Sequence, residues 1–164
     1  MADSPPHRRL VLLRHAKSAW PDGVPDAGRP LNERGRRDAP AAGRWLREHV
    51  DGLGVVVCSP AKRTRETWEL VAAELADPPS PTVDERIYGA PPEDLLTVIR
   101  ELPDAVGGAL LIGHNPGVAE LVELLGGQDR EMRTAAIAVL SWEGAWADAA
   151  ADVARLEEHV TPRG

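Results

Sequence analysis

The chain has 164 residues, enough for one domain with one sizeable core, and its 43% hydrophobic and 27% charged residues are those of an ordinary folded protein. This composition excludes a disordered or membrane-spanning chain, and the net charge of -7 excludes the extended basic face that nonspecific nucleic-acid binding needs. From its length we expect a single domain over residues 1–164, with its core at about 8–158. The lone cysteine, Cys58, excludes an internal disulfide, and we therefore expect the protein in the reducing cytoplasm.

The charge is distributed unevenly along the chain. Residues 1–65 carry 13 Lys and Arg against 7 Asp and Glu, whereas residues 66–164 carry 6 against 19. A local basic cluster in the first part can hold one small anion although the whole protein is acidic.

Four apolar residues at 10–13 predict a buried strand that runs directly into Arg14 and His15. Strands that are apolar on both faces belong to parallel sheets covered by helices, where ligands bind at the carboxyl ends of the strands. Arg14 supplies a permanent cation, and His15 supplies a nucleophile or base that titrates near neutrality. The pair suits a phosphate, although one basic pair is more often only a solvated strand end.

Residues 17–31 contain three prolines and two glycines and predict a loop, which at this position is often part of a site. Trp20 in this loop is expected to pack on its own domain, with lining of the site as the alternative. Asn32 caps the next helix, which begins at Glu33. That helix either kinks at Pro40 or becomes regular just before it.

Residues 54–58 predict a second buried strand. Ser59 and Pro60 then have the residue types of an N-cap and a first helical position. Arg63 lies in the first turn of this helix, where free backbone N–H groups already favour an anion. This is the second basic strand end.

The following segments predict smaller elements. Residues 82–89 predict a short strand and a turn, and residues 93–102 predict a helix. Residues 135–142 predict a further strand, whereas residues 150–158 fit either an edge strand or a poor helix.

Residues 109–113 predict a third buried strand, which delivers His114 and Asn115 at its carboxyl end. Asn115 is expected to cap the helix that follows. Strands joined by right-handed helical crossovers lie parallel, so their carboxyl ends share one edge of the sheet. The side chains expected to converge there are Arg14, His15, Arg63 and His114.

Two arginines and two histidines at one sheet edge fit phosphoryl transfer through a phosphohistidine. A neutral imidazole attacks phosphorus while guanidinium groups bind the oxygens that carry the charge in the transition state. His15 is the expected nucleophile because Arg14 adjoins it, and His114 is expected to donate to the phosphoryl oxygens. Glu85 or Asp84 is available as the acid for the leaving group.

Four segments resemble motifs of the histidine phosphatase superfamily, which includes cofactor-dependent phosphoglycerate mutases, acid phosphatases and SixA-type phosphohistidine phosphatases. They are residues 13–16 for its Arg-His-Gly signature, 29–35 for the segment before its first helix, 59–63 with Thr67 for its second phosphate-binding motif, and 113–117 for its second histidine. The short chain, Ala16 in place of glycine, and residues 88–90 look most like the SixA-type branch.

The resemblance implies a phosphoglycerate mutase-like α/β fold, with a mostly parallel central sheet and helices on both faces. It implies that His15 is the phosphorylated nucleophile and that no metal or cofactor is needed. It also implies a phosphate pocket of Arg14, Arg63 and His114, to which we add Asn115 from the same strand end. Glu85 matches the glutamate proton donor of the mutases, which SixA-type members need not keep.

The leading hypothesis is a phosphatase that acts on phosphohistidine in a protein, because so short a chain leaves little sequence for a lid over a small metabolite. A small-molecule phosphomonoesterase of the same family is the next hypothesis. A metal-dependent phosphoesterase with His15, His114 and Glu85 as ligands is disfavoured by the adjacent arginines, which would repel the cation. The last alternative is a phosphate- or phosphoprotein-binding module without catalysis.

Overall fold

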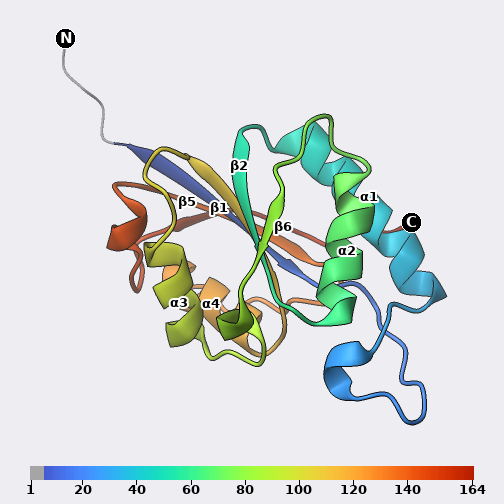
Figure 1. The fold of residues 1–164 in the computed structure, drawn as a ribbon. Coiled ribbons are helices and arrows are strands. Elements are labelled where there is room, and N and C mark those ends of the chain that lie inside the picture. The colour runs from blue at the N-terminus through green and yellow to red at the C-terminus, as the bar shows by residue number, and fades with distance from the viewer. Residues whose placement is uncertain (1–5) are drawn as a thin grey trace.

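The computed structural model describes residues 6–164 as one six-stranded sheet with helices on both faces (Figure 1), which confirms the predicted α/β fold. The first five residues of the expected domain lie outside the described range. The strands are β1 (His7–Arg14), β2 (Leu53–Cys58), β3 (Pro81–Val83), β4 (Gly108–Gly113), β5 (Ile137–Glu143) and β6 (Arg155–Val160). The helices are α1 (Glu33–His49), α2 (Lys62–Ala72), α3 (Pro92–Arg100) and α4 (Gly117–Gly126), with short 3-10 helices η1 (Asp26–Gly28), η2 (Glu85–Ile87) and η3 (Trp146–Asp148). None of these helices is long and apolar enough to cross a membrane.

The strand order is β3-β2-β4-β1-β5-β6. Strands β1 to β4 are parallel, whereas β5 pairs antiparallel with β1 and β6 pairs antiparallel with β5. Of the segment 150–158, which the sequence left open between strand and helix, residues 155–158 belong to the edge strand β6 and the residues before them are irregular, so the helical alternative is wrong. Because β1, β2 and β4 are parallel neighbours, their carboxyl ends meet at one edge of the sheet.

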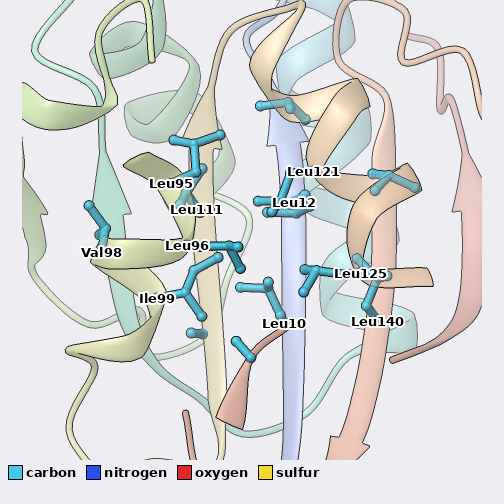
Figure 2. Close-up of a cluster of buried hydrophobic side chains, with 14 of the residues drawn as sticks. Leu10, Leu12, Leu95, Leu96, Val98, Ile99, Leu111, Leu121, Leu125 and Leu140 are labelled. Atoms are coloured by element: carbon cyan, nitrogen blue, oxygen red, sulfur yellow. The ribbon is translucent and has the colours of Figure 1, made fainter. Parts of the chain in front are cut away.

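Alternate residues of β1 supply the two halves of the core. Leu10 and Leu12 point toward α3 and α4, as Figure 2 shows, while Val11 and Leu13 pack with residues of α1 and α2. All four side chains are fully buried. Burial of each stabilises the fold by roughly 1.5–3 kcal/mol. The central strand is held on both faces, so its last residue has a fixed position.

Helix α1 begins where its cap predicts. The Asn32 side chain accepts a hydrogen bond of 2.9 Å from the backbone N–H of Gly35. The helix then continues through Pro40 without interruption, so the expectation of a regular helix only from that point is wrong. Buried Ala39 and Ala42 on either side pack this part of the helix, and such packing offsets the one backbone donor that the proline lacks.

The two other expected caps are wrong. Helices α2 and α4 begin later than Ser59 and Asn115 suggest, and neither has a side-chain cap. The hydroxyl of Ser59 contacts His114 instead, and the amide of Asn115 donates to the carbonyl of Met132. Both polar side chains are directed to the strand-end site rather than to the helix that follows.

Candidate active site

A polar cavity of about 210 Å³ lies at the carboxyl edge of the parallel strands. Its lining confirms the predicted convergence, because it includes all four side chains expected there and Asn115. The full set is Arg14, His15, Lys17, Ser18, Trp20, Arg29, Arg63, His114, Asn115 and Thr134. A larger hollow of about 320 Å³ lies beside Val50 and Leu53, at the start of β2, and no histidine lines it.

His15 is held as a neutral imidazole with one free nitrogen. It is only 6% exposed, and its Nδ1 lies 2.8 Å from the carbonyl oxygen of Ala16. A carbonyl only accepts, so Nδ1 carries the hydrogen and Nε2 keeps its lone pair. Burial is the main reason that the pKa of His15 is lowered to about 3. The nearby His114, Arg14 and Arg63 contribute to this lowering, and the hydrogen bond to Ala16 opposes it. The ring is therefore an unprotonated nucleophile at neutral pH.

The second histidine faces the first, with ring centroids 5.3 Å apart. Its Nε2 lies 2.7 Å from the buried hydroxyl of Ser59, which also accepts a hydrogen bond from the backbone N–H of Ala61. The Ser59 hydroxyl forms no hydrogen bond to another acceptor among the described residues, so we assign its hydrogen to the bond with Nε2 of His114. Nδ1 of His114 then carries the ring hydrogen.

This Nδ1 of His114 is buried and has no hydrogen-bond partner among residues 6–164. Burial, followed by the charge of Arg63, lowers the pKa of His114 to about 4. A neutral ring with a free Nδ1–H is a donor suited to a phosphoryl oxygen.

The two arginines have spare donors as well. Nε of Arg14 and Nε of Arg63 are buried and have no partner among the described residues. Burial and the neighbouring charge of Arg63 lower the pKa of Arg14, because two guanidinium groups share one pocket. An anion between them would relieve this repulsion and accept the spare hydrogen bonds.

Arg63 is also tied to the loop of residues 17–31, which lies beside the start of α2 (Figure 1). Its Nη1 donates to the carbonyl of Asp26 over 2.7 Å, and its Nη2 donates to the Asp26 carboxylate over 3.1 Å. Tyr88 and Arg29 donate to the same carboxylate. The Tyr88 hydroxyl, with Arg29 and Arg63, holds the pKa of Asp26 well below its usual range. Asp26 is thus a charged link between the loop and the cavity.

Trp20 and Arg29 form the outer part of the lining. Arg29 is 7% exposed, whereas Trp20 is 76% exposed and its ring centroid lies 3.2 Å from the guanidinium carbon of Arg29. The expectation that Trp20 packs on its own domain holds for one face of the indole, which the buried guanidinium of Arg29 covers, while the other face is exposed to solvent. The alternative, that Trp20 lines the site, is confirmed.

Two predicted site residues have less direct positions. Glu85 begins η2, is exposed, and is absent from the cavity lining, so its role as the acid stays a prediction. Asn115 lines the cavity, but its amide nitrogen is used by Met132 and its Oδ1 has no partner among the described residues. No group of three or more His, Cys, Asp or Glu in residues 6–164 is arranged to hold a metal ion.

Four side chains make contacts that the sequence does not predict. Ser59 has the residue type of a helix cap and lies in a segment that resembles the second phosphate-binding motif, and Arg29 lies in the segment that resembles the one before the first helix. Asp26 gives no local signal and Tyr88 only a resemblance to the SixA-type branch, since each has its role through contacts with residues distant in sequence. The one sequence feature that marks Arg29 is its position directly before a proline, at the end of the loop that leads to the capped helix.

Comparison with known proteins identifies a family and relatives that match most of the chain. Residues 10–103 match the model of the histidine phosphatase superfamily, branch 1. An uncharacterised protein of Mycobacterium tuberculosis is 38% identical over 162 residues, which cover 92% of this chain and 100% of the relative. An uncharacterised chloroplast protein of Arabidopsis thaliana is 32% identical over 94% of this chain and 78% of its own length.

Solved structures agree in fold. A candidate phosphohistidine phosphatase SixA from Nakamurella multipartitia is 32% identical, with a TM-score of 0.88 over 98% of this chain and 99% of the other. A candidate SixA from Agrobacterium tumefaciens is 27% identical, with a TM-score of 0.79 over 94% and 99%. The protein histidine phosphatase SixA in complex with tungstate is 24% identical, with a TM-score of 0.82 over 94% and 97%.

Proposed function

The chain belongs to the histidine phosphatase superfamily, and we propose that it removes phosphate from phosphohistidine on a protein through a phosphohistidine formed on His15. One observation carries the proposal. The free Nε2 of His15, the free Nδ1–H of His114 and the spare guanidinium donors belong to residues that line one cavity. These are a nucleophile and the donors that a transferring phosphoryl group requires.

In the first step, the lone pair on Nε2 of His15 attacks phosphorus while the bond from phosphorus to the substrate nitrogen breaks. The electron pair of that bond stays on the substrate imidazole, which leaves as a neutral ring when its other nitrogen already carries a proton. Arg14, Arg63 and His114 donate to the three phosphoryl oxygens as their charge is redistributed. A protonated imidazole leaves readily, so this substrate requires little help from a carboxylic acid such as Glu85.

In the second step, water attacks the phosphorus of phospho-His15. The bond to Nε2 breaks, the electron pair returns to the ring, and inorganic phosphate leaves with the oxygen of water. The protons of water are shared between phosphate and solvent. His15 regains its starting form because Nδ1 stays protonated against the carbonyl of Ala16 throughout.

The protein substrate is supported by similarity to proteins described as SixA phosphohistidine phosphatases, one of which is 32% identical. The cavity is lined by the residues that the proposal assigns to phosphate binding, and Trp20 in its lining is largely exposed to solvent. An open site of this kind suits a phosphorylated side chain on a larger partner.

The test compares hydrolysis of a phosphohistidine peptide with that of a small aliphatic phosphoester, in the presence of a chelator. We expect the peptide to be preferred and His15→Ala to lose at least about a thousandfold in kcat/KM. His49→Ala is the matched control, because His49 is an exposed histidine stacked on Trp45 in α1, and it should keep full activity. Phosphate bound to protein should be trapped on wild type, stable in alkali and labile in acid, and absent from His15→Ala.

Each other outcome selects a different function. Preference for the ester would indicate a small-molecule phosphomonoesterase. Activity that the chelator abolishes and a metal restores would indicate the metal-dependent enzyme. Phosphate binding without turnover of either substrate would indicate the binding module.

A further inference from the structure

Trp20 is the one large apolar side chain among the ten described residues that line the cavity. Its indole is 76% exposed, the largest exposure among the large hydrophobic side chains of the described range. Exposed aromatic surface is unfavourable in water, and burying it in a complex recovers that free energy. Because Trp20 lines the same cavity as His15 and Arg63, its indole can contact the part of a substrate that is released from the phosphate.

The guanidinium of Arg29 holds one face of the indole in place. The guanidinium of Arg29 lies 3.2 Å from the ring centroid, and a cation at this distance over an indole is attracted to its π-electrons. Arg29 itself is fixed by hydrogen bonds to the carbonyl of Ala19 over 3.0 Å, the hydroxyl of Ser18 over 2.6 Å and the carboxylate of Asp26 over 3.1 Å. All three nitrogens of the guanidinium are therefore held.

One face of the indole is thus occupied and the other is free at the border of the cavity. A fixed aromatic face binds with little loss of conformational entropy, because the side chain is already ordered. Planar rings stack on such a face with a favourable energy beyond their buried area, whereas aliphatic alcohols offer no face to stack.

We propose that Trp20 is a specificity-determining residue that stacks on the planar ring released from the phosphate, which is the imidazole of phosphohistidine. This inference rests on the proposed function and names how the same site distinguishes its substrate. Arg29 is the positioning residue, since it holds the indole in the orientation that leaves one face free.

The test uses two substrates with the same phosphorus–nitrogen bond. A phosphohistidine peptide releases a ring, whereas phosphoramidate releases ammonia. We expect Trp20→Ala to lower kcat/KM for the peptide about tenfold, mainly through KM, and to leave phosphoramidate within about twofold. Trp20→Phe should retain most of the activity on the peptide. Val24→Ala, an exposed apolar residue of the same loop outside the cavity, should behave as wild type on both substrates.

Equal losses on both substrates, or no loss on either, would overturn the role of Trp20. Failure of wild type to hydrolyse both substrates would instead overturn the proposed function. In that case a binding measurement decides the role of Trp20. The affinity of the phosphohistidine peptide for the single variant His15→Ala is compared with its affinity for the double variant that also carries Trp20→Ala. A weaker complex of the double variant supports the stacking role, and equal affinities reject it.

Discussion

The two halves of the site are held by different physical means. Arg14 ends β1, and His15 and His114 directly follow β1 and β4, whose apolar side chains are fully buried. Hydrogen bonds to the backbone or to Ser59 set the state of each histidine. Trp20 and Asp26 belong to a loop without strand pairing beyond the single bridge from Ser18 to Leu31, and ionic and cation–π contacts hold them. We therefore expect the strand half to perform the chemistry and the loop half to select the substrate.

Arg63 joins the two halves, so its loss should have the largest effect after that of His15. Arg63→Ala removes both the proposed guanidinium donor to the phosphoryl group and the partner of Asp26. We expect kcat/KM to fall about a hundredfold or more on every substrate, and inhibition by inorganic phosphate to weaken. Arg63→Lys keeps the charge but not the fork of donors, and it should recover only a small part of the activity. Steady-state kinetics with phosphate as product inhibitor measures both effects.

Ser59 belongs to the strand half, and its removal should perturb chemistry without weakening the fold around the loop. In Ser59→Ala, Nε2 of His114 loses its donor, and the preference for a hydrogen on Nδ1 is lost. We expect kcat to fall about tenfold, the equivalent of one buried hydrogen bond, and Ser59→Thr to recover it. Nitrogen chemical shifts of His114 should report Nδ1–H in wild type and a mixture of tautomers in the variant. An unchanged tautomer would contradict this role.

Asp26 tests the loop half alone. Asp26→Asn keeps the shape of the side chain but removes the charge that Arg63, Arg29 and Tyr88 share. We expect kcat to fall several-fold because Arg63 is less firmly oriented. Inhibition by phosphate should stay the same or become stronger, because one negative charge near the pocket has been removed. Weaker inhibition by phosphate would show instead that Asp26 supports the pocket as a whole.

The smallest expected effect is on stability at acidic pH. His15 and His114 have pKa values of about 3 and about 4 in the fold, below the ordinary 6.5, because burial disfavours their charged forms. As pH falls below about 6.5, the unfolded chain binds protons that the folded chain does not, so the free energy of unfolding decreases. Each histidine contributes up to about 1.4 kcal/mol per pH unit. Urea unfolding of His15→Asn between pH 6.5 and 4.5 should therefore show a shallower decline than wild type, and an identical decline would contradict the buried neutral state.

The sequence predicts the sheet and the edge at which the site residues meet. Apolar runs at 10–13 and 109–113 followed by Arg14, His15 and His114 predict parallel strands and a shared polar edge, because continuous apolar strands must be covered on both faces. The structure confirms that fold and that convergence. Local patterns predict these strands well because each buried strand requires its own run of apolar residues, which can be recognised without knowing the rest of the fold.

Only the tertiary structure decided which hydrogen bonds the polar side chains form. Ser59 has the residue type of a cap, yet its partner is His114, 55 residues away, because β2 and β4 are neighbours in the sheet. Asp26 and Trp20 depend in the same way on Arg63 and Arg29, whose positions follow from the path of a loop without periodic sequence. The sequence by itself determined the strands, since these depend on local apolar patterns, and it predicts His15 as the nucleophile from its place after one of them. The tautomers, the ion pairs and the exposed indole were decided by packing, since each depends on contacts between segments that only the fold brings together.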